Sequence, residues 1–222
     1  MQSVFSQLFQ LQYGEEMRLI SVCLMVFFLA LTLNFGVVLA HSDYQFPEAN
    51  PGQVNEALGK IVPIRFLPSH PFYFLITTKE FFARVFRPTA EKKASFDFIV
   101  SGKRLKEAYL LLEKDDEKGT TRGLARYSRQ LEKFAEQFEK TKSQNQDMTS
   151  LTMETAEGLK DHETLLIAIL KKSQEDGLSS GFDVSFDDAF SNFGRVVYLI
   201  DDVKPGVKDR YKTITGDGEP LN

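Results

Sequence analysis

Histidine is the residue type best suited to proton transfer or metal binding at neutral pH, and this sequence contains three. His41 and His70 stand in segments without helical apolar spacing. His162 lies on the apolar side of an expected helix, between Asp161 and Glu163. One interpretation makes it a weak candidate metal ligand or proton acceptor, working with carboxylates of a facing helix. We favour the other, a histidine at the edge of the core, because no second histidine stands four residues away.

Nucleophilic catalysis and phosphate binding have little support in the sequence. The only cysteine, Cys23, lies inside a long apolar segment, which excludes an intramolecular disulfide and a zinc site built from cysteines. No serine has a base positioned beside it by a recognisable local motif. The glycines at 177–181 lack the rest of a phosphate-binding loop. We therefore expect a protein that is not an enzyme and needs no cofactor.

The charge balance argues against a nucleic-acid partner. Charged residues make up 26% of the chain and the formal net charge is -4, so no broad basic face is expected. The carboxylates Glu113, Asp115, Asp116 and Glu117 cluster in one short stretch. We interpret this stretch as a solvated turn between two helices.

One apolar segment, Leu19 to Ala40, contains no charged residue. As a helix with about 1.5 Å rise per residue it would reach roughly 30 Å, the thickness of the hydrocarbon core of a bilayer. The sequence therefore predicts a lipid bilayer as a partner of this segment, which serves as a transmembrane anchor or as a signal peptide.

Two interpretations of the apolar segment stay open. Read from Met17, the basic Arg18, the apolar stretch and the end at Ala40 have the layout of a cleavable signal peptide, and Met17 would be the true start. Read from Met1, residues 1–18 form a short cytoplasmic arm before a retained anchor. Either way residues 41–222 are expected on the extracytoplasmic side, because Arg18 is the only basic residue near the segment.

Helical periodicity dominates the rest of the chain, after a linker at 41–66. Several prolines and glycines favour an extended spacer in that linker. The first helix is expected from Pro71 to Phe86, with Pro71 at the first helical position. Apolar residues that recur every three or four positions predict further helices at 88–114, 121–141, 149–173 and 185–203.

These elements predict an all-α fold, in which an N-terminal transmembrane or signal helix precedes an up-and-down antiparallel helical bundle. The bundle is assigned to residues 67–175. A further amphipathic helix at 183–203, opened by Ser185 and Asp188 as an N-cap pair, is expected to pack on the bundle or to lie on a membrane or partner. A polar tail is expected at 204–222.

The segment Leu67-Pro68-Ser69-His70-Pro71-Phe72-Tyr73-Phe74-Leu75 contains the pattern Leu-Pro-x-x-Pro-x-Tyr-x-Leu, and Pro88 leads a Lys-Lys-Ala stretch further on. This segment resembles the opening of a bacterial family of exported or membrane-anchored α-helical domains of unknown function. The resemblance covers about residues 67–172, and His162 is similar to a histidine near the family's last helix. The sequence departs from the pattern where Arg87 precedes Pro88, since an acidic cap is usual there. The resemblance implies export and a helical fold, and it implies no activity.

Together these features lead to one preferred hypothesis and one alternative. We expect a non-catalytic, exported protein of the cell envelope, whose bundle presents a surface to a protein partner or to a second copy of itself. The alternative is an envelope domain that senses a ligand or a metal through His162 and nearby carboxylates.

Overall fold

The computed structural model describes residues 49–210, and every regular element in that range is an α-helix. The predicted all-α class is confirmed for this part of the chain. No helix within it is long and apolar enough to cross a membrane. The predicted membrane segment from Leu19 to Ala40 lies outside the described residues. The helices are α2 (Pro51–Lys60), α3 (Tyr73–Val85), α4 (Ala90–Leu112), α5 (Glu117–Ser143), α6 (Thr149–Asp176), α7 (Ser180–Asp201) and α8 (Val207–Arg210).

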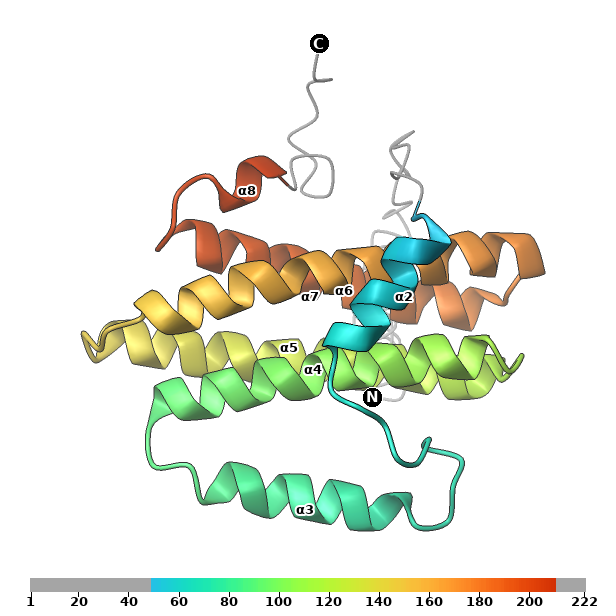
Figure 1. Ribbon diagram of the computed structural model, residues 1–222, viewed down its shortest axis with the longest axis horizontal. Coiled ribbons are helices and arrows are strands. Elements are labelled where there is room, and N and C mark those ends of the chain that lie inside the picture. The colour runs from blue at the N-terminus through green and yellow to red at the C-terminus, as the bar shows by residue number, and fades with distance from the viewer. Residues whose placement is uncertain (1–48, 211–222) are drawn as a thin grey trace, which may run out of the picture. The chain divides into compact units, whose positions relative to one another are not determined.

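The four long helices α4, α5, α6 and α7 form a bundle, in which each helix reverses the direction of the one before it (Figure 1). Helix α4 packs against α5 and α6, and α7 packs against the same two helices from the other side. Consecutive helices α5 and α6 therefore occupy opposite corners. The predicted helical bundle is confirmed. The periodicity did not indicate that α5 and α6, although consecutive in the sequence, lie diagonally across the bundle.

Regular apolar spacing explains the interior of the bundle. The predicted stripe on α5 is buried throughout, since Leu124, Tyr127, Leu131 and Phe134 are fully enclosed and Phe138 is 1% exposed. Residues spaced three or four apart share one face of a helix, so the stripe faces the core as a unit. Helix α7 adds Phe182, Phe186, Phe193, Val197 and Ile200 to the same apolar cluster.

The expectation of an extended spacer is wrong between residues 51 and 60, where the chain forms α2. Asn50 caps this helix, because its Oδ1 accepts from the Gly52 amide at 2.9 Å while Gln53 Oε1 accepts from the Asn50 amide at 3.1 Å. Pro51 follows at the first helical position, where a missing N–H costs nothing. Val54 and Ala57 are buried, so α2 packs on α6 as part of the bundle.

Several predicted helix ends shift by a few residues. Helix α3 begins at Tyr73 rather than Pro71, because Pro71 lies in the turn before it. Thr89 rather than Pro88 caps α4, since its hydroxyl accepts from the Lys92 amide at 3.2 Å. The predicted acidic turn does lie between α4 and α5, but α5 begins at Glu117, where Asp116 is the N-cap and its Oδ1 accepts from the Gly119 amide at 2.9 Å.

The C-terminal part of the bundle also differs from its prediction. Helix α7 begins at Ser180, with Ser179 as the N-cap, so the predicted cap pair of Ser185 and Asp188 lies inside the helix. Its buried phenylalanines join it to the bundle through α5. The expected polar tail contains the short helix α8, which packs against α7.

Candidate functional site

Helix α3 lies beside α4 and is attached to it by polar side chains. Tyr73, Glu80 and Arg84 recur at intervals of seven and four residues, which places them on one face of α3. That face is turned toward Asp97, Lys103, Arg104 and Glu107 of α4, which are all buried. Because buried charged groups must be paired, the side of α4 that faces α3 requires polar partners.

We call these side chains of α3 and α4 the polar contact, and Tyr73 lies at one end of it. Arg104 Nη1 donates to the Tyr73 hydroxyl at 2.6 Å, and that hydroxyl donates to Glu107 Oε2 at 2.7 Å. Arg104 also pairs with Glu107 Oε1 at 2.8 Å. Burial, reinforced by the negative charge of Glu107, raises the pKa of Tyr73. The phenol therefore stays protonated and acts as a hydrogen-bond link between α3 and α4.

Two further links continue the contact along α3. Glu80 pairs with Lys103 at 2.5 Å and with Arg104. Arg84 Nε donates to both carboxylate oxygens of Asp97, at 2.8 and 3.0 Å. Asp97 is fully buried and also accepts from Gln130 Nε2 of α5 at 2.8 Å. The groups on α4 are shielded from water, so removing the partner of one of them costs more than breaking a surface ion pair would.

The opposite side of α3 is apolar and exposed. We call it the outward face of α3. Its seven side chains are between 51% and 78% exposed. Full burial of a large apolar side chain contributes about 1.5–3 kcal/mol, so this face leaves roughly 5–10 kcal/mol of burial unused. The residues are Phe72, Phe74, Leu75, Phe81, Phe82, Val85 and Phe86.

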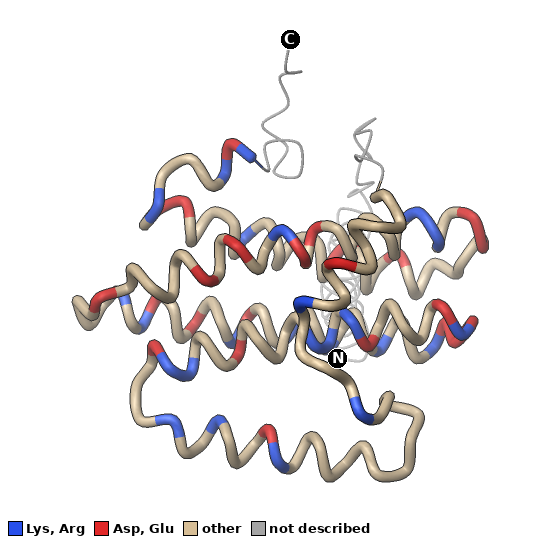
Figure 2. Tube along the Cα trace, in the orientation of Figure 1, with Lys and Arg blue, Asp and Glu red and all other residues tan. Residues whose placement is uncertain are grey.

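The exposed charged residues in the stretch that contains α3 are basic. Of the charged residues between 61 and 93, the exposed ones are Arg65, Lys79 and Lys92. Glu80 is the only acidic residue of α3, and it is turned toward α4. Figure 2 shows this single acidic position among the basic positions along α3.

A basic cavity of about 280 Å³ lies next to this face, between α3, α4 and α5. Arg84 and Arg104 line it from the polar contact together with Glu80, which pairs with Arg104, and Arg126, Arg129 and Lys133 line it from α5. The Nη1 atom of Arg126 is buried and has no hydrogen-bond partner among the described residues. The same guanidinium lies over the Tyr73 ring, 5.5 Å from its centroid. Because an unpaired buried donor costs about 1–3 kcal/mol, Arg126 favours an acceptor at this cavity.

His162 lies in the interior of the bundle, on α6. Its ring stacks on Phe98 of α4 with centroids 4.8 Å apart, and its Nδ1 is 3.3 Å from the Tyr127 hydroxyl of α5. Gly102 of α4 makes room for it, because a Cβ there would lie 2.7 Å from His162 Nε2. Burial lowers the pKa of His162 to about 3. The imidazole is therefore neutral at physiological pH, as expected of a core histidine.

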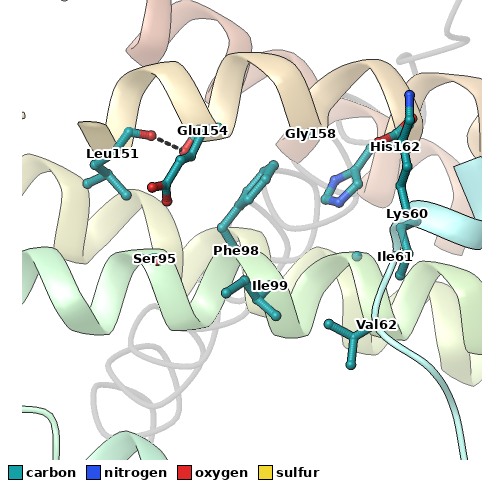
Figure 3. Close-up of a pocket in the computed structure, with 13 residues that line it drawn as sticks. Lys60, Ile61, Val62, Ser95, Phe98, Ile99, Leu151, Glu154, Gly158 and His162 are labelled. Atoms are coloured by element: carbon teal, nitrogen blue, oxygen red, sulfur yellow. Dashed lines mark hydrogen bonds and ion pairs between the residues drawn. The ribbon is translucent and has the colours of Figure 1, made fainter. Parts of the chain in front are cut away.

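A second cavity, of about 170 Å³, opens beside this histidine (Figure 3). Ile61, Phe98 and Gly158 line it together with His162, and Asp161 and Lys60 also contribute to its lining. The nearby carboxylates do not gather around the imidazole: within residues 49–210, no group of three or more His, Cys, Asp or Glu side chains is placed to hold a metal ion.

The segment from Gly177 to Gly181 has the Gly-x-Ser-x-Gly spacing of a nucleophile elbow, with Ser179 at the serine position. That motif depends on a strand-to-helix turn that exposes the serine beside a histidine. Here Ser179 connects two helices and donates its hydroxyl to Glu117. The spacing therefore arises from a helix C-cap at Gly177, with φ of 63°, followed by the start of α7.

The structure separates the motif residues that the sequence singled out. Tyr73 is buried in the polar contact, whereas Leu75 is exposed on the outward face. Leu67 and Pro68 are half-buried in the turns before α3, where the His70 amide donates to the Leu67 carbonyl at 2.9 Å. Pro71 and Pro88 are exposed on either side of α3.

Sequence reasoning missed the residues that attach α3 and those that line the basic cavity. A signal was present on α3, because Tyr73, Glu80 and Arg84 form a stripe opposite the phenylalanines. Arg104 and Glu107 likewise follow Asp97 at helical spacing on α4. The pairs between α3 and α4 are 13 to 34 residues apart in the sequence, so only the tertiary structure identifies them.

Comparison with known proteins supports the resemblance to a domain of unknown function. Residues 65–161 match the sequence model of a domain of unknown function (DUF5667). No curated protein and no solved structure matches the chain. The match includes α3, α4, α5 and the first half of α6, and therefore all residues of the polar contact. The chain thus contains an uncharacterised helical domain, to which α2 and α7 add further helices of the bundle.

Proposed function

We propose that this protein is a non-catalytic module of the cell envelope that makes contact with its surroundings through the outward face of α3. In this proposal, the apolar segment from Leu19 to Ala40 exports the chain or anchors it in the membrane. The bundle is then the rigid support that holds α3 in place.

The single observation that carries the proposal is the orientation of α3. A helix with one apolar side normally buries that side in its own domain. Here the polar side is turned toward α4 and the apolar side is exposed, with the Phe82 ring against those of Phe81 and Phe86. Such surfaces on soluble domains mark sites of contact with another molecule or a membrane.

Photo-crosslinking in cells that express the full chain tests this proposal. A photoreactive amino acid replaces Phe82 on the outward face, which is 51% exposed, or Met153 on α6, which is 54% exposed and serves as the matched control. We expect adducts from position 82 and few from position 153. Equal yields of adduct at the two positions would overturn the proposal.

A second candidate function is binding of a small ligand beside His162. The cavity of about 170 Å³ next to this histidine favours it, because ligand sites combine apolar walls with a few polar groups that orient the ligand. Thermal unfolding of the full chain in detergent, with benzene or with Zn²⁺, provides the test. A rise in midpoint that His162→Phe abolishes supports the candidate, and no shift with either probe rejects it.

A further inference from the structure

We infer that the occupant of the outward face of α3 is an anionic phospholipid surface, with a headgroup phosphate bound in the basic cavity between α3, α4 and α5. This inference rests on the proposed function, because it names the partner of the same face. It combines two independent observations, the apolar face and the unsatisfied arginine beside it.

The outward face has the composition of an interfacial helix. Such helices insert phenylalanine and leucine to a shallow depth and place Lys or Arg at the level of the headgroups. Lys79 stands at the margin of the apolar surface, four residues after Leu75 and three before Phe82. The acidic Glu80 is withdrawn into contacts with α4, so α3 presents no negative charge to an anionic surface.

The basic cavity is suited to a phosphate group. Arg126, Arg129 and Lys133 line it and form no ion pair among the described residues. Arg126 Nη1 is a buried donor without an acceptor there. Arginine is well suited to phosphate oxygens, because its planar group donates two parallel hydrogen bonds.

Phe81 connects the two features. It belongs to the outward face and also lines the basic cavity. A phospholipid whose phosphate is in the cavity would therefore have its apolar part next to the phenylalanines of α3. This continuity of basic and apolar surface fits a lipid better than a free anion, which has no apolar part.

A second copy of the chain fits the same face less well. Specific protein interfaces use about 20–30 residues on each side, whereas the outward face has seven. Two copies meeting through α3 would also bring the basic residues around each face together. The predicted membrane segment ends at Ala40, only nine residues before the described part begins at Ala49. A retained anchor would thus keep Ala49 within about 30 Å of the bilayer, since an extended residue spans at most about 3.6 Å.

Fluorescence quenching by spin-labelled lipids tests the inference on the full chain in nanodiscs. Cys23 is replaced by serine, and one new cysteine at Phe82 or at Met153 carries the fluorophore. The discs contain phosphatidylcholine alone or phosphatidylcholine with one quarter phosphatidylglycerol. We expect quenching at position 82 that depends on phosphatidylglycerol, and none at position 153 in either lipid.

Charge variants test the basic cavity. Arg126→Gln and the exposed Lys133→Gln should each lower the docking constant of α3 on the anionic discs about fivefold, because each basic residue near such a surface contributes about that factor. Arg122→Gln, on α5 and outside the cavity, should leave docking unchanged. Lys133 is exposed, so its variant folds even if Arg126→Gln does not.

The outcomes separate this inference from the proposed function. If position 82 is not quenched and its photo-adducts are proteins, the lipid inference fails while the proposed contact face stands. If position 82 yields neither quenching nor adducts, both fail. If inorganic phosphate alone stabilises the chain as much as anionic discs do, and position 82 stays in water, the cavity binds free phosphate and the lipid inference is overturned.

Discussion

Helices α3 and α7 are both amphipathic and rich in phenylalanine, yet they are oriented in opposite ways. In α7, Phe182, Phe186 and Phe193 are buried in the core of the bundle. In α3, Phe74, Phe81 and Phe82 are exposed. Amphipathic spacing specifies which residues share a face, and the surface of the neighbouring helix decides whether that face is buried.

The neighbours of the two helices explain the difference. Helix α7 meets α5, whose long apolar stripe belongs to the same cluster. Helix α3 meets a row of buried charged residues on α4, which includes Asp97, Arg104 and Glu107. Apolar side chains placed against that row would leave the charged groups unpaired, at a cost of several kcal/mol per ion, about as much as the burial of two phenylalanines contributes.

The comparison is tested most strongly by truncation of one phenylalanine in each helix. Phe193→Ala on α7 should lower the free energy of unfolding by about 3–5 kcal/mol, because the side chain is fully buried. Phe82→Ala on α3 should change it by less than about 0.5 kcal/mol. Chemical denaturation of the full chain measures both values. Equal losses would show that α3 also contributes apolar packing to the fold.

Removing a charge from the polar contact should release α3 and leave α7 in place. In Glu107→Gln, Arg104 loses a buried partner, at a cost of about 3 kcal/mol, and the bond to Tyr73 weakens. Amide hydrogen exchange in α3 should therefore accelerate about 100-fold, with little change in α7. Glu113→Gln, at the exposed C-cap of α4, is the matched control and should have little effect. Equal acceleration in α3 and α7 would contradict a separate attachment of α3.

Acid should destabilise the bundle through the buried His162. This effect acts on the core and not on the exposed face of α3. The pKa of His162 is about 3 in the folded chain, against an ordinary value of 6.5. The unfolded chain therefore binds the proton at a higher pH than the folded chain does, and stability falls as pH drops through this window. At pH 5 the loss relative to pH 7.5 should be about 2 kcal/mol.

The matched variant His162→Gln isolates this effect from those of neighbouring groups. Burial raises the pKa of Asp161 and Glu163, and these carboxyls favour the folded state as they become protonated. The difference between wild type and variant, measured by denaturation between pH 7.5 and 5, removes their contribution. A difference that does not vary with pH would show that the imidazole is accessible to protons in the folded chain.

Two glycine substitutions should change the stability of the chain in opposite directions. Gly194→Ala on α7 should stabilise the chain by about 0.5–1 kcal/mol, because alanine favours the helix and its Cβ meets nothing within 4 Å. Gly102→Ala on α4 should destabilise it by about 1–3 kcal/mol, since its Cβ would lie 2.7 Å from His162. Thermal unfolding distinguishes the two signs. Stabilisation by Gly102→Ala would show that His162 moves freely.

The sequence predicted the helices with regular apolar stripes most accurately. The α5 stripe from Leu124 to Phe138 is buried as expected, because every third or fourth residue is apolar and the other side is charged. Helix α2 was missed because its proline and glycine were interpreted as signs of an extended spacer. Pro51 in fact starts the helix behind the cap at Asn50, a local effect that composition alone does not separate from a loop.

The candidate site was less accessible to prediction. Tyr73 was singled out as part of a local motif, but its partners Arg104 and Glu107 lie more than thirty residues away. Arg126 and Lys133, which line the basic cavity, read as ordinary charged residues on the polar side of α5. No local pattern distinguishes a charge that faces solvent from one that faces another helix.

By itself, then, the sequence determined the helical class, the approximate limits of the long amphipathic helices and which of their residues share each face. These properties depend on backbone geometry and on the spacing of residues within one helix. Only the tertiary structure decided that α3 turns its phenylalanines outward, and that Arg84, Arg104 and Arg126 meet at one cavity. The reason is that the burial of a face depends on the free energy of contact with helices from distant parts of the chain, and α4 presents charged groups where α5 presents apolar ones.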